Sequence, residues 1–152
     1  MSTHLWNEVR ERVFASSTVL TINRDRDRVK ETAEIFTPSD LVIEMIQRLG
    51  VTRLGPGLTV LDPACGDGQF LIVAKWVKVV FFGMREEEAL SEIYGVDLMW
   101  DNVQACRSRL GGGTIVLGDA LHPHRRVAGQ TAEDQAELMR ILGQNEELEL
   151  FT

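Results

Sequence analysis

Cysteine, proline and long apolar runs are all scarce in this sequence of 152 residues. Its 2 cysteines could form at most one bridge, which excludes a small scaffold held together by disulfides. The most apolar stretch, residues 70–82, is interrupted by Lys75 and Lys78 and is shorter than the roughly 18 apolar residues of a membrane-spanning helix. Residues 1–8 lack the basic start and apolar core of a signal peptide. We therefore expect a cytoplasmic protein that does not associate with membranes.

Positive charge is also in deficit, because 16 Lys and Arg stand against 23 Asp and Glu, giving a net charge of −7. The deficit is uneven, since residues 1–30 carry six basic and four acidic side chains and residues 31–152 carry a net charge of −9. Proteins that bind nucleic acid usually present a basic face. The charge balance therefore argues against DNA binding by this chain alone. DNA contact through one patch or through a complex remains an alternative.

The first part of the chain contains two helical patterns with an extended, charged stretch between them. Apolar residues recur at helical spacing over 5–14 and again over 41–49, with Ser39 predicted as the N-cap of the second helix. The β-branched run 18–22 favours a short strand. The alternating charges of 24–28 are typical of a solvated surface, with a phosphate contact as the alternative.

Further along the chain, β-rich apolar runs alternate with helical patterns. Strands are predicted at 58–61, 92–96 and 114–117. Helices are predicted from Gln69, over 84–90, over 99–110 and within the acidic tail after Thr131. Alternation of strand and helix implies parallel pairing with right-handed crossovers. We therefore expect an α/β fold in which a short parallel sheet is flanked by helices.

Each predicted strand ends in an aspartate, at Asp62, Asp97 and Asp119. Open parallel sheets bind ligands just beyond the carboxyl ends of their strands, and the glycines of the turn 62–68 let the backbone approach a ligand closely. The turn lacks the lysine of a P-loop, and its carboxylates, Asp62 and Asp67, would repel a phosphate. A nucleoside that bears a cationic group fits better, with Asp97 placed for the ribose hydroxyls. The alternative is an α/β domain whose acids cap helices around an empty crevice.

Four segments in order resemble the motifs of S-adenosylmethionine-dependent DNA adenine-N6 methyltransferases. Residues 61–71, Leu-Asp-Pro-Ala-Cys-Gly-Asp-Gly-Gln-Phe-Leu, are similar to the first motif of that family, and Phe-Thr-Pro at 36–38 is similar to its upstream cofactor motif. Residues 94–98 and 118–121 resemble the second and third motifs. The order is that of methyltransferases whose cofactor half precedes the catalytic half, as in type I restriction-modification methylation subunits. The resemblance implies a truncated Rossmann-like methyltransferase fold and S-adenosyl-L-methionine as the cofactor.

The resemblance also implies a role for each matching residue near the first strand. Thr37 and Pro38 would close over the methionine end of the cofactor. Asp62, Ala64 and Gly66 would line its methionyl and sugar part.

At the second and third strands the resemblance implies contacts to the nucleoside. Asp97 would bind the ribose hydroxyls, and Leu98 would lie against the adenine face. Asp119 would accept a hydrogen bond from the adenine amino group, with Ala120 beside it. Phe70 matches the first motif too, either as part of the site or as a core residue.

No metal site or thiol nucleophile is predicted. His122 and His124 lie near each other but lack the further ligands that a metal ion needs. Neither Cys65 nor Cys106 has a histidine at motif spacing.

The catalytic loop of the family has no counterpart in this sequence. Methyl transfer in the family uses an Asn/Asp/Ser-Pro-Pro-aromatic loop after a fourth strand, which holds the adenine that leaves the duplex. The four prolines here are Pro38, Pro56, Pro63 and Pro123, and no two are neighbours. Only 33 residues follow Asp119, too few for the remaining strands and a target-reading domain. We therefore predict no catalytic residue in this chain.

The expected organisation is an N-terminal helical and basic segment (1–30), a methyltransferase-like cofactor-binding domain (31–128) and an acidic C-terminal helix or tail (129–152). The expected function is S-adenosylmethionine binding in DNA methylation or restriction-modification, by a chain that is inactive alone or completed by a partner. The alternative is a non-catalytic interaction protein that uses the same domain to engage another protein or DNA. Because residues 59–61 would form an unprotected sheet edge, we expect a homo-oligomer or a second chain that completes the sheet.

Overall fold

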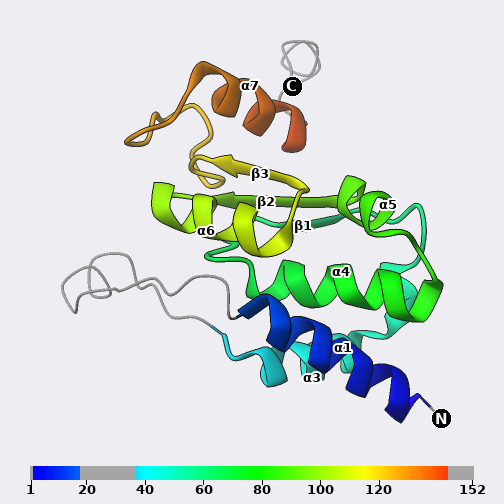
Figure 1. Ribbon diagram of the computed structural model, residues 1–152. Helices are drawn as coiled ribbons and strands as arrows, with labels where there is room; N and C mark the ends of the chain where they lie inside the picture. Colours follow the sequence, from blue (N-terminus) through cyan, green and yellow to red (C-terminus); the bar gives the residue numbers. More distant parts are fainter. Residues whose placement is uncertain (1, 18–36, 144–152) are drawn as a thin grey trace.

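A short sheet with helices on both faces is formed within residues 2–17 and 37–143, the residues that the computed structural model describes (Figure 1). Its strands are β1 (Val60–Asp62), β2 (Ile93–Asp97) and β3 (Thr114–Leu117). They are parallel and are ordered β1-β2-β3 across the sheet. The truncated Rossmann-like α/β fold predicted from the sequence is therefore confirmed, and in the part of the chain that the structure describes β1 is an edge strand.

The helices between the strands cover one face of the sheet. The crossover from β1 to β2 contains α4 (Gln69–Phe82) and α5 (Glu86–Ser91), and that from β2 to β3 contains α6 (Trp100–Leu110). Two further helices, α1 (Thr3–Ser17) and α3 (Ser39–Leu49), pack against α4 as an additional layer (Figure 1). Every residue of α4 from Leu71 to Lys78 is buried. This helix is apolar nearly all round because it has neighbours on all sides.

The second face of the sheet is only partly covered. The helix α7 (Ala132–Ile141) packs its Leu138 against Val96 of β2 and Val116 of β3. Thr131 caps α7 by accepting the Asp134 N–H at 3.0 Å, and the Asp134 carboxylate accepts the Thr131 N–H in return. On β1 the side chain of Leu61 stays 42% exposed. Apolar surface therefore remains open at the β1 edge.

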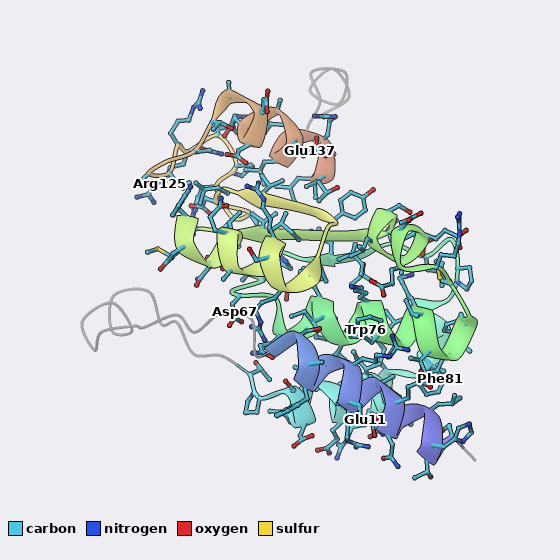
Figure 2. The ribbon with its side chains drawn as sticks, viewed as in Figure 1. Glu11, Asp67, Trp76, Phe81, Arg125 and Glu137 are labelled. Carbon is cyan, nitrogen blue, oxygen red and sulfur yellow. The ribbon has the colours of Figure 1, made fainter. Side chains whose placement is uncertain are left out.

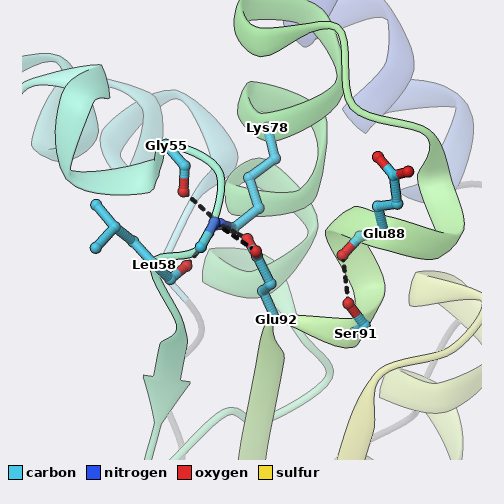
Figure 3. Close-up of polar contacts among 7 residues, drawn as sticks. Gly55, Leu58, Lys78, Glu88, Ser91 and Glu92 are labelled. Atoms are coloured by element: carbon cyan, nitrogen blue, oxygen red, sulfur yellow. Dashed lines mark hydrogen bonds and ion pairs between the residues drawn. The ribbon is translucent and has the colours of Figure 1, made fainter.

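A buried lysine fixes the chain that leads into β1. Lys78 of α4 is fully buried, and its Nζ donates to the carbonyl oxygens of Gly55 at 3.3 Å and Leu58 at 2.7 Å (Figure 3). It also forms a 2.6 Å ion pair with Glu92, whose other carboxylate oxygen accepts the Gly57 N–H. Between η1 (Val51–Leu54) and β1 the chain is thus bonded both to α4 and to Glu92, the residue before β2.

The start of α3 differs from the sequence prediction. Pro38 is the N-cap residue, and Ser39 is the first helical residue, so the prediction of Ser39 as the cap is wrong. The Ser39 hydroxyl instead donates to Gln69 Oε1 at 3.0 Å. This bond ties the N-terminus of α3 to that of α4, which brings Thr37 and the first motif together.

The remaining predictions about the chain ends fall partly outside the described residues. The proposed strand 18–22 and the charged run 24–28 lie there. Within the described residues, α1 buries Trp6, Val9 and Val13 in the same core as α4. The division of the chain at residues 30 and 128 stays a prediction.

None of the helices within residues 2–17 and 37–143 combines the length and the apolar composition that crossing a bilayer requires.

The contacts of Lys78 predict that removing its ammonium group destabilises the fold strongly. We expect Lys78→Met to lower the free energy of unfolding by about 3–5 kcal/mol, because it leaves a mostly buried Glu92 carboxylate without its partner. Urea unfolding measures the change. Arg85→Met is the control, since its pair with Glu88 is exposed to solvent and such pairs contribute little to stability. Equal losses in the two variants would contradict the prediction.

Candidate functional site

A cavity of about 440 Å³ opens at the carboxyl ends of the three strands. Its size lies within the range of small-molecule sites. Most of the residues expected in the site line it, and these are Thr37, Asp62, Ala64, Gly66, Asp97, Leu98 and Asp119. Pro38 and Ala120 are not among the lining residues. The structure therefore brings residues from four separate segments of the sequence together around one cavity.

Other lining residues were missed or left open by the sequence prediction. Phe70, left open between site and core, does line the cavity, as do Met45 of α3 and Leu121 after β3. Met45 is 49% exposed and Leu121 is 87% exposed, so the cavity has an apolar rim. Asn102 of α6 is buried and also lines it. A buried polar residue in the first turn of a helix directly after a strand-end aspartate is the signal that could have found Asn102.

The turn between β1 and α4 depends on its two glycines. Gly66 has φ +55° and Gly68, the N-cap of α4, has φ +95°, a region that side-chain-bearing residues avoid. A Cβ at Gly68 would lie 2.7 Å from Cys106 Sγ of α6. The Cys65 N–H donates to Val96 O of β2 at 2.8 Å, which fixes the turn against the neighbouring strand. The turn is therefore held in one position before any ligand enters.

Asp97 bonds three parts of the site together. One of its carboxylate oxygens, Oδ2, accepts the Gly66 N–H at 2.9 Å. The other, Oδ1, accepts the Met99 N–H at 2.9 Å and Asn102 Nδ2–H at 3.0 Å. A carboxylate has about four acceptor positions, so roughly one is left for a ligand hydroxyl. Asp97 is thus a structural link that also lines the cavity.

Asp62 lies across the cavity with a different electrostatic setting. Its Oδ1 accepts the Ala64 N–H at 3.1 Å. Burial raises the pKa of Asp62 above its ordinary value, against the lowering effect of that hydrogen bond, and the charge of Asp97 adds to the rise. A cationic ligand group between the two carboxylates would relieve this repulsion.

Asp119 closes the third side of the cavity. Burial tends to raise its pKa, but the backbone N–H groups of His122 and Leu121, both at 3.0 Å from Oδ1, outweigh burial and lower the pKa. His122 Nδ1 also lies 3.4 Å from Asp119 Oδ2. The lowered pKa keeps Asp119 ionised and able to accept hydrogen bonds from a ligand.

Asp67, the second carboxylate of the turn after β1, does not line the cavity. Its Oδ2 forms a 2.6 Å ion pair with Arg109 Nη1 of α6, and the Asp67 and Arg109 side chains are only 13% and 3% exposed. The charge of Asp67 is therefore matched by a buried arginine from a helix that is distant in the sequence.

Metal binding has no support within the described residues, where no group of three or more His, Cys, Asp or Glu could hold an ion. Arg125 projects from the loop after β3 into solvent (Figure 2). Cys65 and Cys106 are buried and free, and the hydrogen bond of the Cys65 thiol to Cys106, together with burial, strongly raises the pKa of that thiol. A thiolate nucleophile is therefore disfavoured at this position.

A family model described as N-6 DNA methylase matches residues 20–110, more than half of the 152 residues. The match contains the turn after β1, Asp97 and α6, and it stops before β3. The position of Asp119 in the site therefore rests on the structure. No curated protein and no solved structure matches the chain.

The lowered pKa of Asp119 predicts how its contribution to stability depends on pH. Asp119 contributes stability above the ordinary aspartate pKa of 3.8, and the contribution disappears as pH falls through the lower value of the folded state. Asp119→Asn should therefore be less stable than the wild type at pH 7, and the gap should narrow towards pH 3. Urea unfolding at several pH values tests this, with Asp40→Asn on α3 as an exposed control. A gap that stays constant with pH would refute it.

Proposed function

Since the chain belongs to the N-6 DNA methylase family, we propose that its cavity binds S-adenosyl-L-methionine. The observation that carries the proposal is that Asp62, Asp97 and Asp119 converge on one cavity whose described lining contains no Lys, Arg or His. Such a site favours a ligand with positive charge and hydroxyl and amino donors. S-Adenosyl-L-methionine has a sulfonium, an ammonium group, ribose hydroxyls and an adenine amino group. When bound, it supplies an electrophilic methyl group.

In the proposed binding mode each of these residues has one role. Asp97 accepts from a ribose hydroxyl through its remaining acceptor position, and Asp119 accepts from the adenine amino group. Leu98, which is 50% exposed, covers the adenine face. Asp62, which also lines the cavity, is assigned to the methionyl part, whose cationic groups its charge would favour.

The biological setting that we propose is DNA adenine methylation in the cytoplasm, as part of a restriction-modification system. The 152 residues contain no two neighbouring prolines, so the Pro-Pro-aromatic loop that positions the target adenine must come from elsewhere. We propose that a second chain supplies it by adding strands beside β1. Leu58 and Leu61 are 47% and 42% exposed at that edge, and a parallel strand is normally flanked on both sides. DNA contact then arises through the complex.

A non-catalytic interaction protein is the second candidate function. It is favoured by the exposed apolar edge together with a second hollow of about 420 Å³ between β1, β2 and α7, lined by Thr59, Leu61 and Tyr94 on the sheet side. In this candidate function the methylase-like domain serves as a binding surface. Failure of S-adenosyl-L-methionine to bind at millimolar concentration would favour it.

Binding of the cofactor is tested best at Asp62, because Asp62→Asn preserves shape and disturbs one local hydrogen bond. Asp97→Ala would also release Gly66, Met99 and Asn102. We expect Asp62→Asn to weaken S-adenosyl-L-methionine binding about tenfold, or ~1.4 kcal/mol, in calorimetric titration. Asp40→Asn, outside the cavity, should bind like the wild type. Equal affinity in all three proteins would disprove this role for Asp62.

The same carboxyl group gives the binding a pH dependence. Because the pKa of Asp62 is raised, its charge is lost at a higher pH than that of an ordinary aspartate. Affinity for the cationic ligand should fall as pH decreases from neutrality, and the fall should be smaller in Asp62→Asn.

Methyl transfer by the purified chain alone should be absent. Alignment of acceptor and donor can account for roughly 7–11 kcal/mol of a barrier, and no described residue of the cavity replaces the missing loop. Incorporation of labelled methyl groups into duplex DNA measures this. Substantial incorporation by the single chain would overturn the proposal that a second chain completes the enzyme.

The open edge of β1 gives a direct test of partner binding. The Val60 N–H donates to Glu92 O at 2.8 Å, so the N–H groups of Thr59 and Leu61, which alternate with it, point away from β2. These two amides should exchange with deuterium rapidly in dilute protein and become protected when a completing chain is added or when the protein self-associates at higher concentration. Light scattering on the same samples reports the mass. Full protection in a monomer would exclude the edge as a docking site.

A further inference from the structure

Three residues on one face of α6 contact the turn after β1 or the aspartate that holds it. Asn102 donates to Asp97 Oδ1, Cys106 lies against Gly68, and Arg109 pairs with Asp67. Their spacing of four and then three residues places them in one row along the helix. The row runs from the cavity wall, where Asn102 lies, to the buried end of the turn.

The last of these contacts is the one least explained by packing alone. Arg109 is 6% exposed, and its Nη1 lies 2.6 Å from Asp67 Oδ2 and 3.4 Å from the main-chain oxygen of Asp67. The guanidinium therefore binds both the side chain and the backbone of the residue between Gly66 and Gly68. These glycines could adopt many other conformations, so a contact to the residue between them limits where the turn can lie.

We propose that Arg109 is a positioning residue for the cofactor site, which acts by holding the Gly66–Gly68 turn against α6 through Asp67. The proposal rests on the proposed binding of S-adenosyl-L-methionine and extends it to a residue outside the cavity. Its consequence is that affinity depends on a buried ion pair that touches no ligand. Asp67 then serves to orient the backbone and not to contact the cofactor.

The distinguishing experiment replaces both charges at once, as Asp67→Leu with Arg109→Met. Replacing a whole buried ion pair by apolar residues of similar volume is often neutral for stability, so a merely structural role predicts little change in any property. A positioning role predicts an unchanged thermal midpoint with S-adenosyl-L-methionine binding weakened about tenfold or more, and faster deuterium exchange in residues 62–69. Glu44→Leu with Arg48→Met, an exposed pair on α3, is the matched control and should leave binding unchanged.

Each outcome of this experiment decides the proposal. A folded double variant with wild-type affinity and wild-type exchange in 62–69 would overturn it. If the double variant does not fold, Arg109→Lys takes its place, because lysine keeps the positive charge and lacks the planar guanidinium group. The proposal then requires a weakening of S-adenosyl-L-methionine binding in the same direction, though smaller than about tenfold. If the wild type binds no S-adenosyl-L-methionine, the proposed function fails, and the exchange measurement alone still decides whether Arg109 holds the turn.

Discussion

The carboxylate of Asp97 is the contact on which the rest of the site depends. Three donors from two segments reach it, namely the Gly66 N–H, the Met99 N–H and the Asn102 side chain. Hydrogen bonds to a charged acceptor are among the strongest in proteins. Because one group holds both the glycine turn and the start of α6, the cavity has its shape before a ligand arrives. Such preorganisation lowers the cost of ordering the site on binding.

The acidic residues near the cavity lie in different electrostatic environments, which could not be predicted from their spacing in the sequence. Asp62 faces the cavity and carries a raised pKa, whereas Asp119 is held ionised by backbone N–H groups. Asp67, five residues after Asp62, has its charge matched by Arg109. The cavity therefore carries negative charge, but the charge of Asp67 is neutralised outside it, which limits the repulsion among the carboxylates.

Local patterns were sufficient to predict the sheet and the three aspartates that line the cavity at its edge. Asp62 and Asp97 end β1 and β2, Asp119 follows shortly after β3, and parallel pairing brings all three to one edge. Contacts between distant segments could not be predicted in this way. Serine is a favoured N-cap residue, yet the Ser39 hydroxyl donates to Gln69, thirty residues later in the chain. The direction of Asp67 likewise depends on how α6 packs, which no short window of sequence specifies.

The brevity of β1 links ligand binding to the lifetime of the protein. With three residues, β1 spans about 10 Å. The Lys78 contacts just before β1 and Asp62 at its last position are therefore so close that we expect them to unfold together as one cooperative unit. A ligand that binds only the folded state then adds its free energy to global unfolding, by about 2.7 kcal/mol at a concentration one hundred times Kd. Proteases in a cell act on the unfolded fraction. The amount of this protein should therefore rise and fall with the supply of whatever fills the cavity.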